Sequence, residues 1–238
     1  MEDVVTEKGI EKFRAAVTDS VSIMVKALSI FAGKYSHIAV YTCAAHTLHL
    51  IIGDITKLKS AEDTVDTCTC IVKEINKSQI LKASFTELQK EGGQICYLKI
   101  PVPTRWGSIL RCLIRLLKLK NILERLVSNE ETNLSRRLRN SVLDDDTFWR
   151  YVQKHHELIH PAVTLIFLLE SEKAKVSSVP QCFKELNDHF KSAFQEAFWQ
   201  KRSTKLLWRV SVHEWTWPWK IFIVPHILDP KFNGWIYQ

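Results

Sequence analysis

Three side chains able to bind metal ions or make strong hydrogen bonds follow two short apolar segments near the N-terminus. Asp19 comes directly after residues 15–18, and Cys43 and His46 come after residues 37–42, which are rich in β-branched and aromatic side chains. Open α/β sheets keep their sites at the carboxyl ends of the strands. A carboxylate there can hold Mg²⁺, and a pair of such ions can drive phosphoryl transfer. Asp19 is therefore the candidate metal ligand and catalytic residue; the alternative is an aspartate that caps the following helix.

Cys43 and His46 form a Cys-x-x-His pair at the start of a predicted helix. Thiolates and imidazoles are zinc ligands, but a structural zinc site needs four of them, and no second pair occurs at finger spacing. His49, Cys68 and Cys70 are the remaining candidates for such a site. A buried thiol beside a hydrogen-bonding histidine is the interpretation that the missing second pair favours.

Arg105 and Trp106 stand at the beginning of a long predicted helix, residues 104–127, for which Thr104 is a suitable N-cap. A helix N-terminus attracts phosphate, arginine adds a bidentate donor, and an indole offers a stacking surface for a base. Basic residues form a stripe along this helix: Arg111, Arg115, Lys118 and Arg125. The alternatives are a core tryptophan that anchors the helix and a basic face that is merely solvated.

The net charge of +7 is concentrated in one part of the chain. Residues 99–140 contain ten basic and three acidic residues, so this segment alone carries the excess of the whole protein. A concentrated basic segment favours a polyanionic partner such as nucleic acid. The longest apolar run, residues 162–169, is far shorter than the ~20 residues that a bilayer requires, so no membrane span is predicted.

Helical periodicity dominates the chain outside a short β-rich unit. Residues 15–58 read as strand, helix, strand and helix, and residues 95–103 as an extended segment. The remaining predicted helices cover residues 60–92 as a pair, 104–127, a segment that begins at Asp144 and is kinked or divided at Pro161, 162–171 and 177–198. The predicted fold class is therefore mainly α with a small β element.

A tryptophan-rich stretch, residues 199–225, breaks this pattern. It contains five tryptophans and no helical period. Either a lineage-specific insertion or wrongly joined exons explain it, and the sequence favours neither. The six cysteines lack the spacing of a secreted disulfide framework, so reduced thiols in a cytosolic or nuclear protein are expected.

Several motifs occur in an order that resembles the hAT-superfamily DDE transposases. They are Val17-Thr18-Asp19 before a helix, the Cys43-x-x-His46 pair, Pro103-Thr104-Arg105-Trp106, Leu169-Glu170-Ser171 and Ile227-Leu228-Asp229-Pro230-Lys231-Phe232. Enzymes of this family have a ribonuclease-H-like core interrupted by an all-helical insertion, and two aspartates and a glutamate hold their metal ions. The resemblance implies a partial ribonuclease-H-like α/β core over residues 1–59 and an insertion-like helical region over residues 60–238.

The resemblance also implies roles for individual residues. Asp19 matches the second catalytic aspartate, Cys43 and His46 match a pair near the scissile phosphate, and Trp106 matches a tryptophan that stabilises a flipped base. The implied partner is double-stranded DNA at transposon ends, in the nucleus, and a homo-oligomer remains open.

This chain also departs from the family pattern. The first aspartate and the final glutamate are expected outside residues 1–238, and Ser20 and Ile23 replace usual asparagines. Mg²⁺ is therefore expected only if other carboxylates complete the site. The prediction is a fragment, or a decayed or domesticated copy, of an hAT-type transposase that binds DNA and is not catalytic on its own. A non-catalytic helical protein-interaction module is the alternative.

Overall fold

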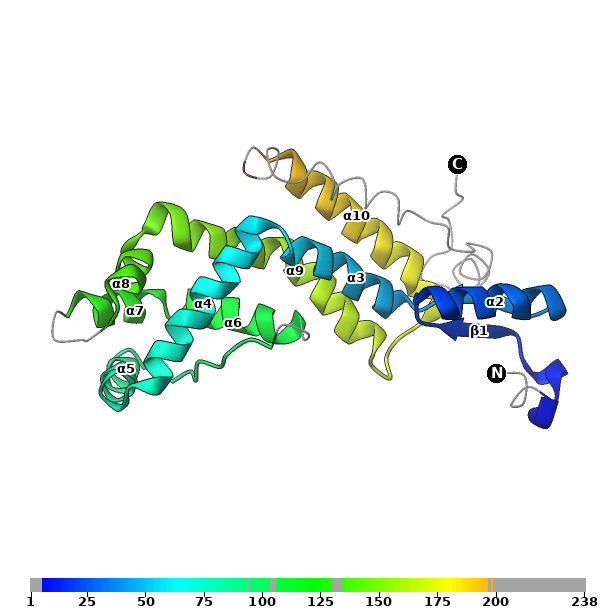
Figure 1. Cartoon of the computed structure of the whole chain (residues 1–238), viewed down its shortest axis with the longest axis horizontal. Helices are drawn as coiled ribbons and strands as arrows, with labels where there is room; N and C mark the ends of the chain where they lie inside the picture. The colour runs from blue at the N-terminus through cyan, green and yellow to red at the C-terminus, as the bar shows by residue number, and fades with distance from the viewer. Residues whose placement is uncertain (1–5, 94, 103–105, 130–133, 197, 199–238) are drawn as a thin grey trace. The chain divides into compact units, whose positions relative to one another are not determined.

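The described part of the chain is mainly helical, with one small parallel sheet (Figure 1). The computed structural model describes residues 6–93, 95–102, 106–129, 134–196 and 198. This architecture confirms the predicted fold class, whereas a ribonuclease-H-like core stays a prediction. Arg105 and the stretch 199–225 lie outside the described residues. None of the described helices is long and apolar enough to span a membrane.

Backbone contacts divide the chain into two units, which are described separately. Unit 1 comprises Met1–Ile51 and Thr164–Gln238, and unit 2 comprises Ile52–Val163. The division falls inside two helices, α3 (Ala44–Thr56) and α9 (Arg150–Leu169). The predicted boundary between residues 59 and 60 rests on the family resemblance and stays a prediction.

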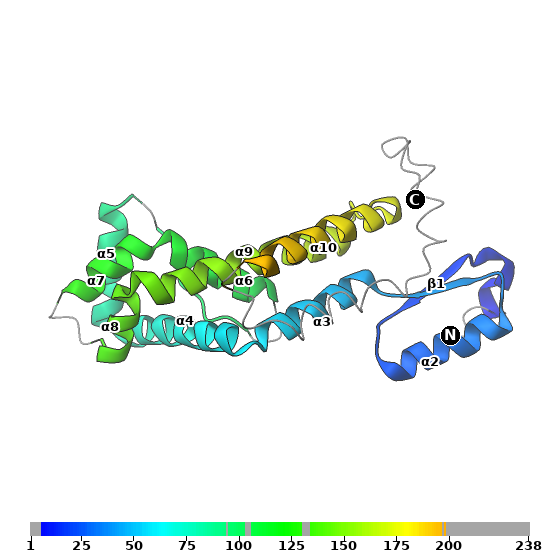
Figure 2. The same ribbon diagram turned by 90° about the horizontal axis from the view of Figure 1, so that it is seen from above.

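The sheet of unit 1 is a β-α-β unit. Strands β1 (Ala15–Thr18) and β2 (Ala39–Thr42) pair in parallel, with Thr18 opposite Thr42, and helix α2 (Ser22–Lys34) connects them (Figure 2). Helix α3 (Ala44–Thr56) follows β2, so the predicted order of elements is confirmed. The second strand begins later than predicted because the Ile38 N–H donates to the Tyr35 carbonyl in a turn.

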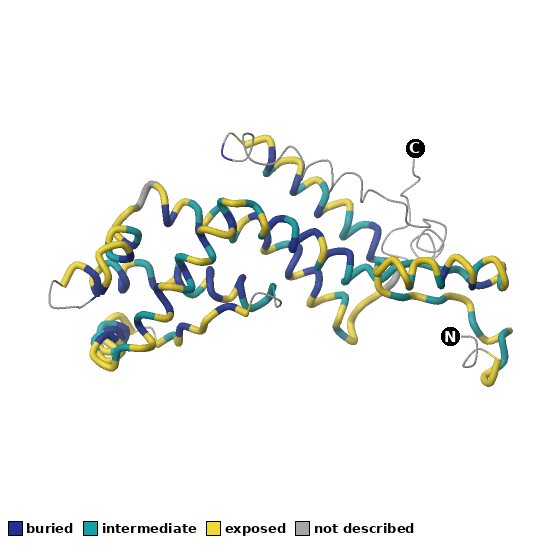
Figure 3. Tube along the Cα trace, in the orientation of Figure 1, coloured by how far each residue is buried: buried dark blue, intermediate teal, exposed yellow. Residues whose placement is uncertain are grey.

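A small apolar cluster supports this sheet. Phe31 of α2 and Ile38 are buried together, with partly buried side chains packed around them: Ile10, Phe13, Ala16, Tyr35 and Val40. Other apolar side chains of β1 and α2 remain exposed, among them Val17 at 52% and Ile23 at 72%. Figure 3 shows exposed positions along much of α2. Unit 1 also contains the short 3₁₀ helices η1 (Ile10–Lys12) and η3 (Val176–Ser178) and helix α10 (Val179–Gln195), close to the helix predicted over residues 177–198.

Unit 2 begins with the predicted pair of amphipathic helices, α4 (Lys59–Lys77) and α5 (Gln79–Glu91). The Ser78 side chain caps α5 by accepting from the Leu81 N–H at 3.2 Å. Helix α4 buries Cys68, Ile71, Val72 and Ile75, and α5 buries Leu81 and Phe85. Ile80, at the start of α5, is 75% exposed.

The predicted extended segment is present over residues 95–102, which have no regular secondary structure. Side chains of the preceding helices hold its backbone. The side-chain Oε1 of Gln89 accepts from the Cys96 N–H at 2.5 Å, and the side-chain Nδ2 of Asn76 donates to the Leu98 carbonyl at 3.5 Å.

The prediction of a single helix over residues 104–127 is wrong, because two helices occupy this region. Helix α6 (Trp106–Lys118) ends at Leu119, and α7 (Lys120–Ser128) begins beyond it. The Leu119 N–H lies 3.0 Å from the Arg115 carbonyl and 3.1 Å from that of Leu116, which tightens the turn. The tightened turn keeps Leu119 fully buried, so core packing outweighs the continuous helical pattern.

Helix α8 (Arg136–Leu143), a π-helical turn η2 (Asp145–Trp149) and helix α9 (Arg150–Leu169) complete the described elements. Asp144 accepts from the Thr147 N–H at 2.9 Å, which confirms the predicted acidic start. The predicted division at Pro161 is wrong, since α9 runs through this residue. Burial of the residues on both sides, Leu158, Ile159, Ala162 and Val163, offsets the roughly 3 kcal/mol that an internal proline costs.

Candidate functional site

The two strand ends of unit 1 bring the first predicted site residues to one edge of the sheet. The Cys43 N–H donates to the Thr18 carbonyl at 2.6 Å, which extends the β1–β2 register by one position. Asp19 and Cys43 therefore follow adjacent parallel strands at their carboxyl ends, where sites form in open α/β sheets.

Asp19 is exposed and belongs to the turn before α2. Its Oδ1 accepts from the Val21 N–H at 3.3 Å, and Val21 is the N-cap of that helix. The Asp19 side chain thus stabilises the start of α2, as the helix-capping alternative proposed. It does so from two residues before the N-cap. No three His, Cys, Asp or Glu side chains gather as a metal site anywhere in the described ranges, so a Mg²⁺ ion at Asp19 would need ligands from elsewhere.

Cys43 and His46 lie at the first turn of α3, and both are half-buried. The Cys43 carbonyl accepts from the Thr47 N–H at 3.0 Å and from its hydroxyl at 3.1 Å, so Cys43 occupies the capping position. Burial, and then the neighbouring Cys43, raise the pKa of the Tyr41 hydroxyl. The zinc alternative lacks support among the residues that the structure describes, because they contain no three-ligand cluster. His49 pairs with Glu170 at 3.3 Å instead.

Trp106 is half-buried at the start of α6 and lies against a glycine of α3. A Cβ added to Gly53 would approach Cζ2 of the indole at 3.4 Å and Cη2 at 3.8 Å. Gly53 is itself buried. The indole thus has a packing role in unit 2, while its exposed part leaves base stacking open as a prediction.

Two substitutions at Gly53 test this contact. Gly53→Ala is expected to be neutral or to stabilise the fold by up to about 1 kcal/mol, because the new methyl group makes an ordinary contact and the helix loses a flexible residue. Gly53→Leu is expected to destabilise it by about 1–3 kcal/mol, because the longer side chain meets the indole. Urea unfolding followed by circular dichroism measures both; equal stability of the two variants would contradict the contact.

Ser108 forms hydrogen bonds with Val102, in the extended segment that precedes α6. The sequence-based prediction did not include this residue. Its hydroxyl accepts from the Val102 N–H at 2.7 Å and lies 3.1 Å from the Val102 carbonyl. This contact fixes the chain on both sides of residues 103–105, which lie outside the described ranges. A serine two residues after the tryptophan of the Thr-Arg-Trp motif was the available signal.

Three of the four residues of the predicted stripe share one face of α6. Arg111, Arg115 and Lys118 are spaced four and three residues apart, and they are exposed or half-buried. The opposite face is buried and consists of Ile109, Leu110, Cys112, Leu113 and Leu116. We call Arg111, Arg115 and Lys118 the basic stripe.

Other basic residues of the segment 99–140 are engaged within unit 2. Arg125 lies on α7 and pairs with Glu91 at 2.8 Å, which corrects its assignment to the stripe. Lys120 lies 5.7 Å from the ring centroid of Trp149, and Arg139 donates to the Val127 carbonyl. The charge of this segment is thus partly used for packing.

Two thiols of unit 2 are buried on α4 and α6, which pack together. Burial raises the pKa of Cys112 to about 11, with Arg115 acting in the opposite direction. Burial, and then the neighbouring Cys112, raise the pKa of Cys68. Cys70, two residues further along α4, is exposed.

These pKa values predict a loss of stability at alkaline pH. Above pH 9 the unfolded chain releases the Cys112 proton while the folded protein retains it, so stability falls as the pH rises from about 9 to about 11. The full loss from Cys112 is about 2–3 kcal/mol. The difference in unfolding free energy between Cys112→Ala and the unsubstituted chain should change with pH over this range. As the control, Cys70→Ala should show the same change of unfolding free energy with pH as the unsubstituted chain.

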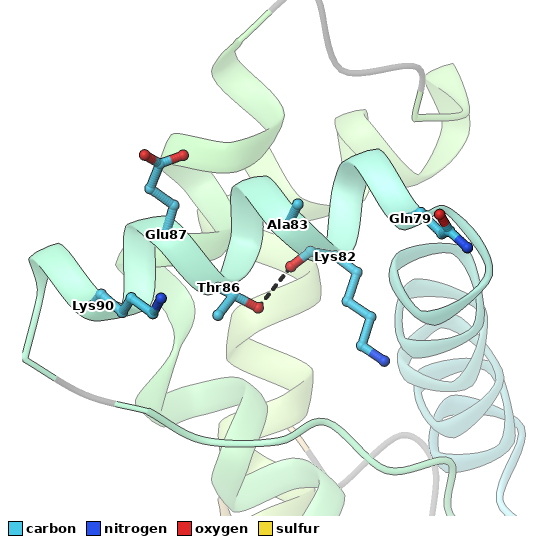
Figure 4. Close-up of a pocket in the computed structure, with 6 residues that line it drawn as sticks. All are labelled: Gln79, Lys82, Ala83, Thr86, Glu87 and Lys90. Carbon is cyan, nitrogen blue, oxygen red and sulfur yellow. Dashed lines mark hydrogen bonds between the residues drawn. The ribbon is translucent and has the colours of Figure 1, made fainter.

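A shallow hollow lies along the exposed side of α5 (Figure 4). All the residues that line it belong to this helix: Gln79, Lys82, Ala83, Thr86, Glu87 and Lys90. The Thr86 hydroxyl donates to the Lys82 carbonyl at 2.7 Å, so it bonds within its own helix. Mixed charges on one exposed helix face suit solvation, and none of the predicted site residues contributes to the hollow.

Comparison with known proteins finds one similarity, which covers most of the helical region. Residues 41–158 match the family model of the ZBED1 RNase-like helical domain, from β2 to the middle of α9. Neither the curated proteins nor the solved structures contain a significant match to the chain. Residues 41–158 are therefore similar to a helical domain of the ZBED1 type, which belongs to the hAT transposase-like family.

Proposed function

We propose that this chain is a transposase-derived, decayed or domesticated protein that binds double-stranded DNA without cutting it. The observation that supports the proposal is the basic stripe on α6. This helix lies within the region that matches the ZBED1 RNase-like helical domain. Guanidinium and ammonium groups at this spacing bind successive phosphates of a nucleic acid backbone. By the family resemblance, Arg105 and Trp106 would add a further cation and a stacking plane, and Cys43 and His46 would contact DNA at the sheet edge. The proposed location is the nucleus.

The surroundings of Asp19 support the proposed lack of catalysis. Two-metal phosphoryl transfer needs several carboxylates around the ions. Asp19 would contribute one ligand to Mg²⁺, and it gathers no acidic partners within the part of the chain that the structure describes. Asp19→Asn is therefore expected to leave DNA binding unchanged.

The test is the salt dependence of binding to a labelled DNA duplex, measured by fluorescence anisotropy. The logarithm of the association constant should fall linearly with the logarithm of salt concentration, with a slope of about −3 or steeper if all three stripe cations contact phosphate. Duplexes of different sequence should bind with similar affinity, because phosphate contacts do not read bases. Binding that does not depend on salt, or no binding at low salt, would contradict the proposal.

A helical protein-interaction module is the second candidate, and the extended segment 95–102 favours it. Four of its apolar side chains are exposed: Ile95, Tyr97, Ile100 and Val102. Exposed apolar side chains in sequence are typical of protein-binding surfaces. Failure of DNA binding together with concentration-dependent self-association, abolished by Tyr97→Ser, would favour this function.

A further inference from the structure

Helix α9 carries two histidines at the spacing of a metal-binding pair. Residues 156–160 read His-Glu-Leu-Ile-His, so His156 and His160 are four residues apart and lie on the same helix face. Their ring centroids are 5.3 Å apart. The sequence-based prediction did not single out this motif, although its spacing is that of two zinc ligands on a helix.

The separation of the rings agrees with shared coordination. Zinc–nitrogen bonds of about 2.0–2.1 Å and a tetrahedral angle place the centroids of two bound imidazoles about 5 Å apart. The rings are already near this distance, so little movement of either side chain is needed. His160 is exposed and His156 is half-buried, which leaves the pair accessible from solvent.

A buried ring nitrogen supplies a second observation. Nδ1 of His156 is buried and has no hydrogen-bond partner among the residues that the structure describes. Such atoms are costly, and a bound water or ion is the usual explanation in a folded protein. Imidazole suits zinc, copper and nickel, so a divalent transition ion is the class of ligand that the pair would take.

The pair spans a weakened turn of the helix. Pro161 follows His160 directly and has no N–H to donate to the carbonyl of Glu157, one turn earlier. An ion held by His156 and His160 would bridge this turn from the side-chain surface. We propose that His156 and His160 form a two-histidine clip for Zn²⁺, with water as the other ligands, that strengthens α9 where Pro161 interrupts its hydrogen bonds.

The same motif supplies the base in zinc peptidases, but the contacts here do not support that role. Glu157 accepts hydrogen bonds from Gln153 at 2.7 Å and Lys154 at 3.1 Å, which hold it as an exposed ion-paired carboxylate. A peptidase site also needs a third protein ligand, and the described residues contain no three-ligand cluster. The clip is therefore proposed as a binding site without catalysis.

The test is a Zn²⁺ titration of the complete chain, followed by the imidazole NMR signals of His156 and His160. Both sets of signals should shift together as one site fills. His160→Gln should weaken the response of His156 by about tenfold or more, because one ligand remains. His156→Gln should have the reciprocal effect. His37→Gln removes an exposed histidine elsewhere and is the matched control, which should leave the titration unchanged.

Hydrogen exchange gives an independent readout. At a zinc concentration about 100 times the dissociation constant, amides of residues 158–163 should exchange up to about 100-fold more slowly, because opening the turn breaks the site. His160→Gln should abolish this protection. The proposal is overturned if the two imidazoles do not respond to millimolar zinc, if His160→Gln leaves the affinity at His156 unchanged, or if exchange in the unsubstituted chain is the same with and without zinc.

Discussion

Trp149→Ala is expected to destabilise the protein by about 4 kcal/mol or more. The indole is 3% exposed, packs edge-on against Phe148 with ring centroids 5.0 Å apart, and donates from Nε1 to the Val142 carbonyl at 2.7 Å. That carbonyl belongs to the last turn of α8, where helices lack internal donors. Removing the ring leaves a cavity that costs about 3–5 kcal/mol, and the unpaired carbonyl adds to the loss.

Two control substitutions separate these contributions. Trp149→Phe retains most of the apolar volume and loses the hydrogen bond, so about 1–3 kcal/mol is expected. Ile80→Ala, at a position 75% exposed, should change stability by no more than about 0.5 kcal/mol. Urea unfolding followed by far-ultraviolet circular dichroism measures all three, since the described chain is mainly helical. A Trp149→Ala variant as stable as Ile80→Ala would show that the indole does not support the packing of unit 2.

Removing the basic stripe is expected to weaken DNA binding roughly 100-fold. The variant carries Arg111→Ala, Arg115→Ala and Lys118→Ala, and three lost phosphate contacts of about 1 kcal/mol each give this factor. The slope of the logarithm of the association constant against the logarithm of salt concentration should become less steep by about 3, which is about one for each cation. Fluorescence anisotropy with a labelled duplex over a range of salt concentrations measures both quantities.

The matched control removes the same charge from elsewhere in unit 2. Lys77, Lys82 and Lys90 are exposed on α4 and α5, and their replacement by alanine also lowers the net charge by three. If the stripe is the binding surface, this variant should retain most of the affinity and slope. Equal losses in the two variants would indicate general attraction to a basic protein, and would contradict a defined surface on α6.

Local sequence patterns were sufficient for the strand and helix order of the N-terminal unit and for the paired helices that follow. The run Ala15–Thr18 became a strand with the predicted bounds, and the Asp19 and Cys43 positions after the strands followed from it. These features depend on neighbouring residues in the chain, through side-chain periodicity and strand alternation. The family resemblance in residues 41–158 likewise depends on the order of residues alone.

Tertiary contacts decided what the sequence left open. Arg125 pairs with Glu91 and is not part of the basic stripe, because the chain turns at Leu119 and Arg125 lies on the next helix, α7. Gly53 leaves space for the Trp106 indole, which is distant in the sequence. Helix α9 continues through Pro161 because the residues on both sides of the proline are buried. Such outcomes depend on which surfaces meet across long chain separations, and burial there outweighs local preference. The sequence by itself thus determined the order of the elements from β1 to α5, whereas packing decided where the later helices end and which basic and aromatic side chains remain available for binding.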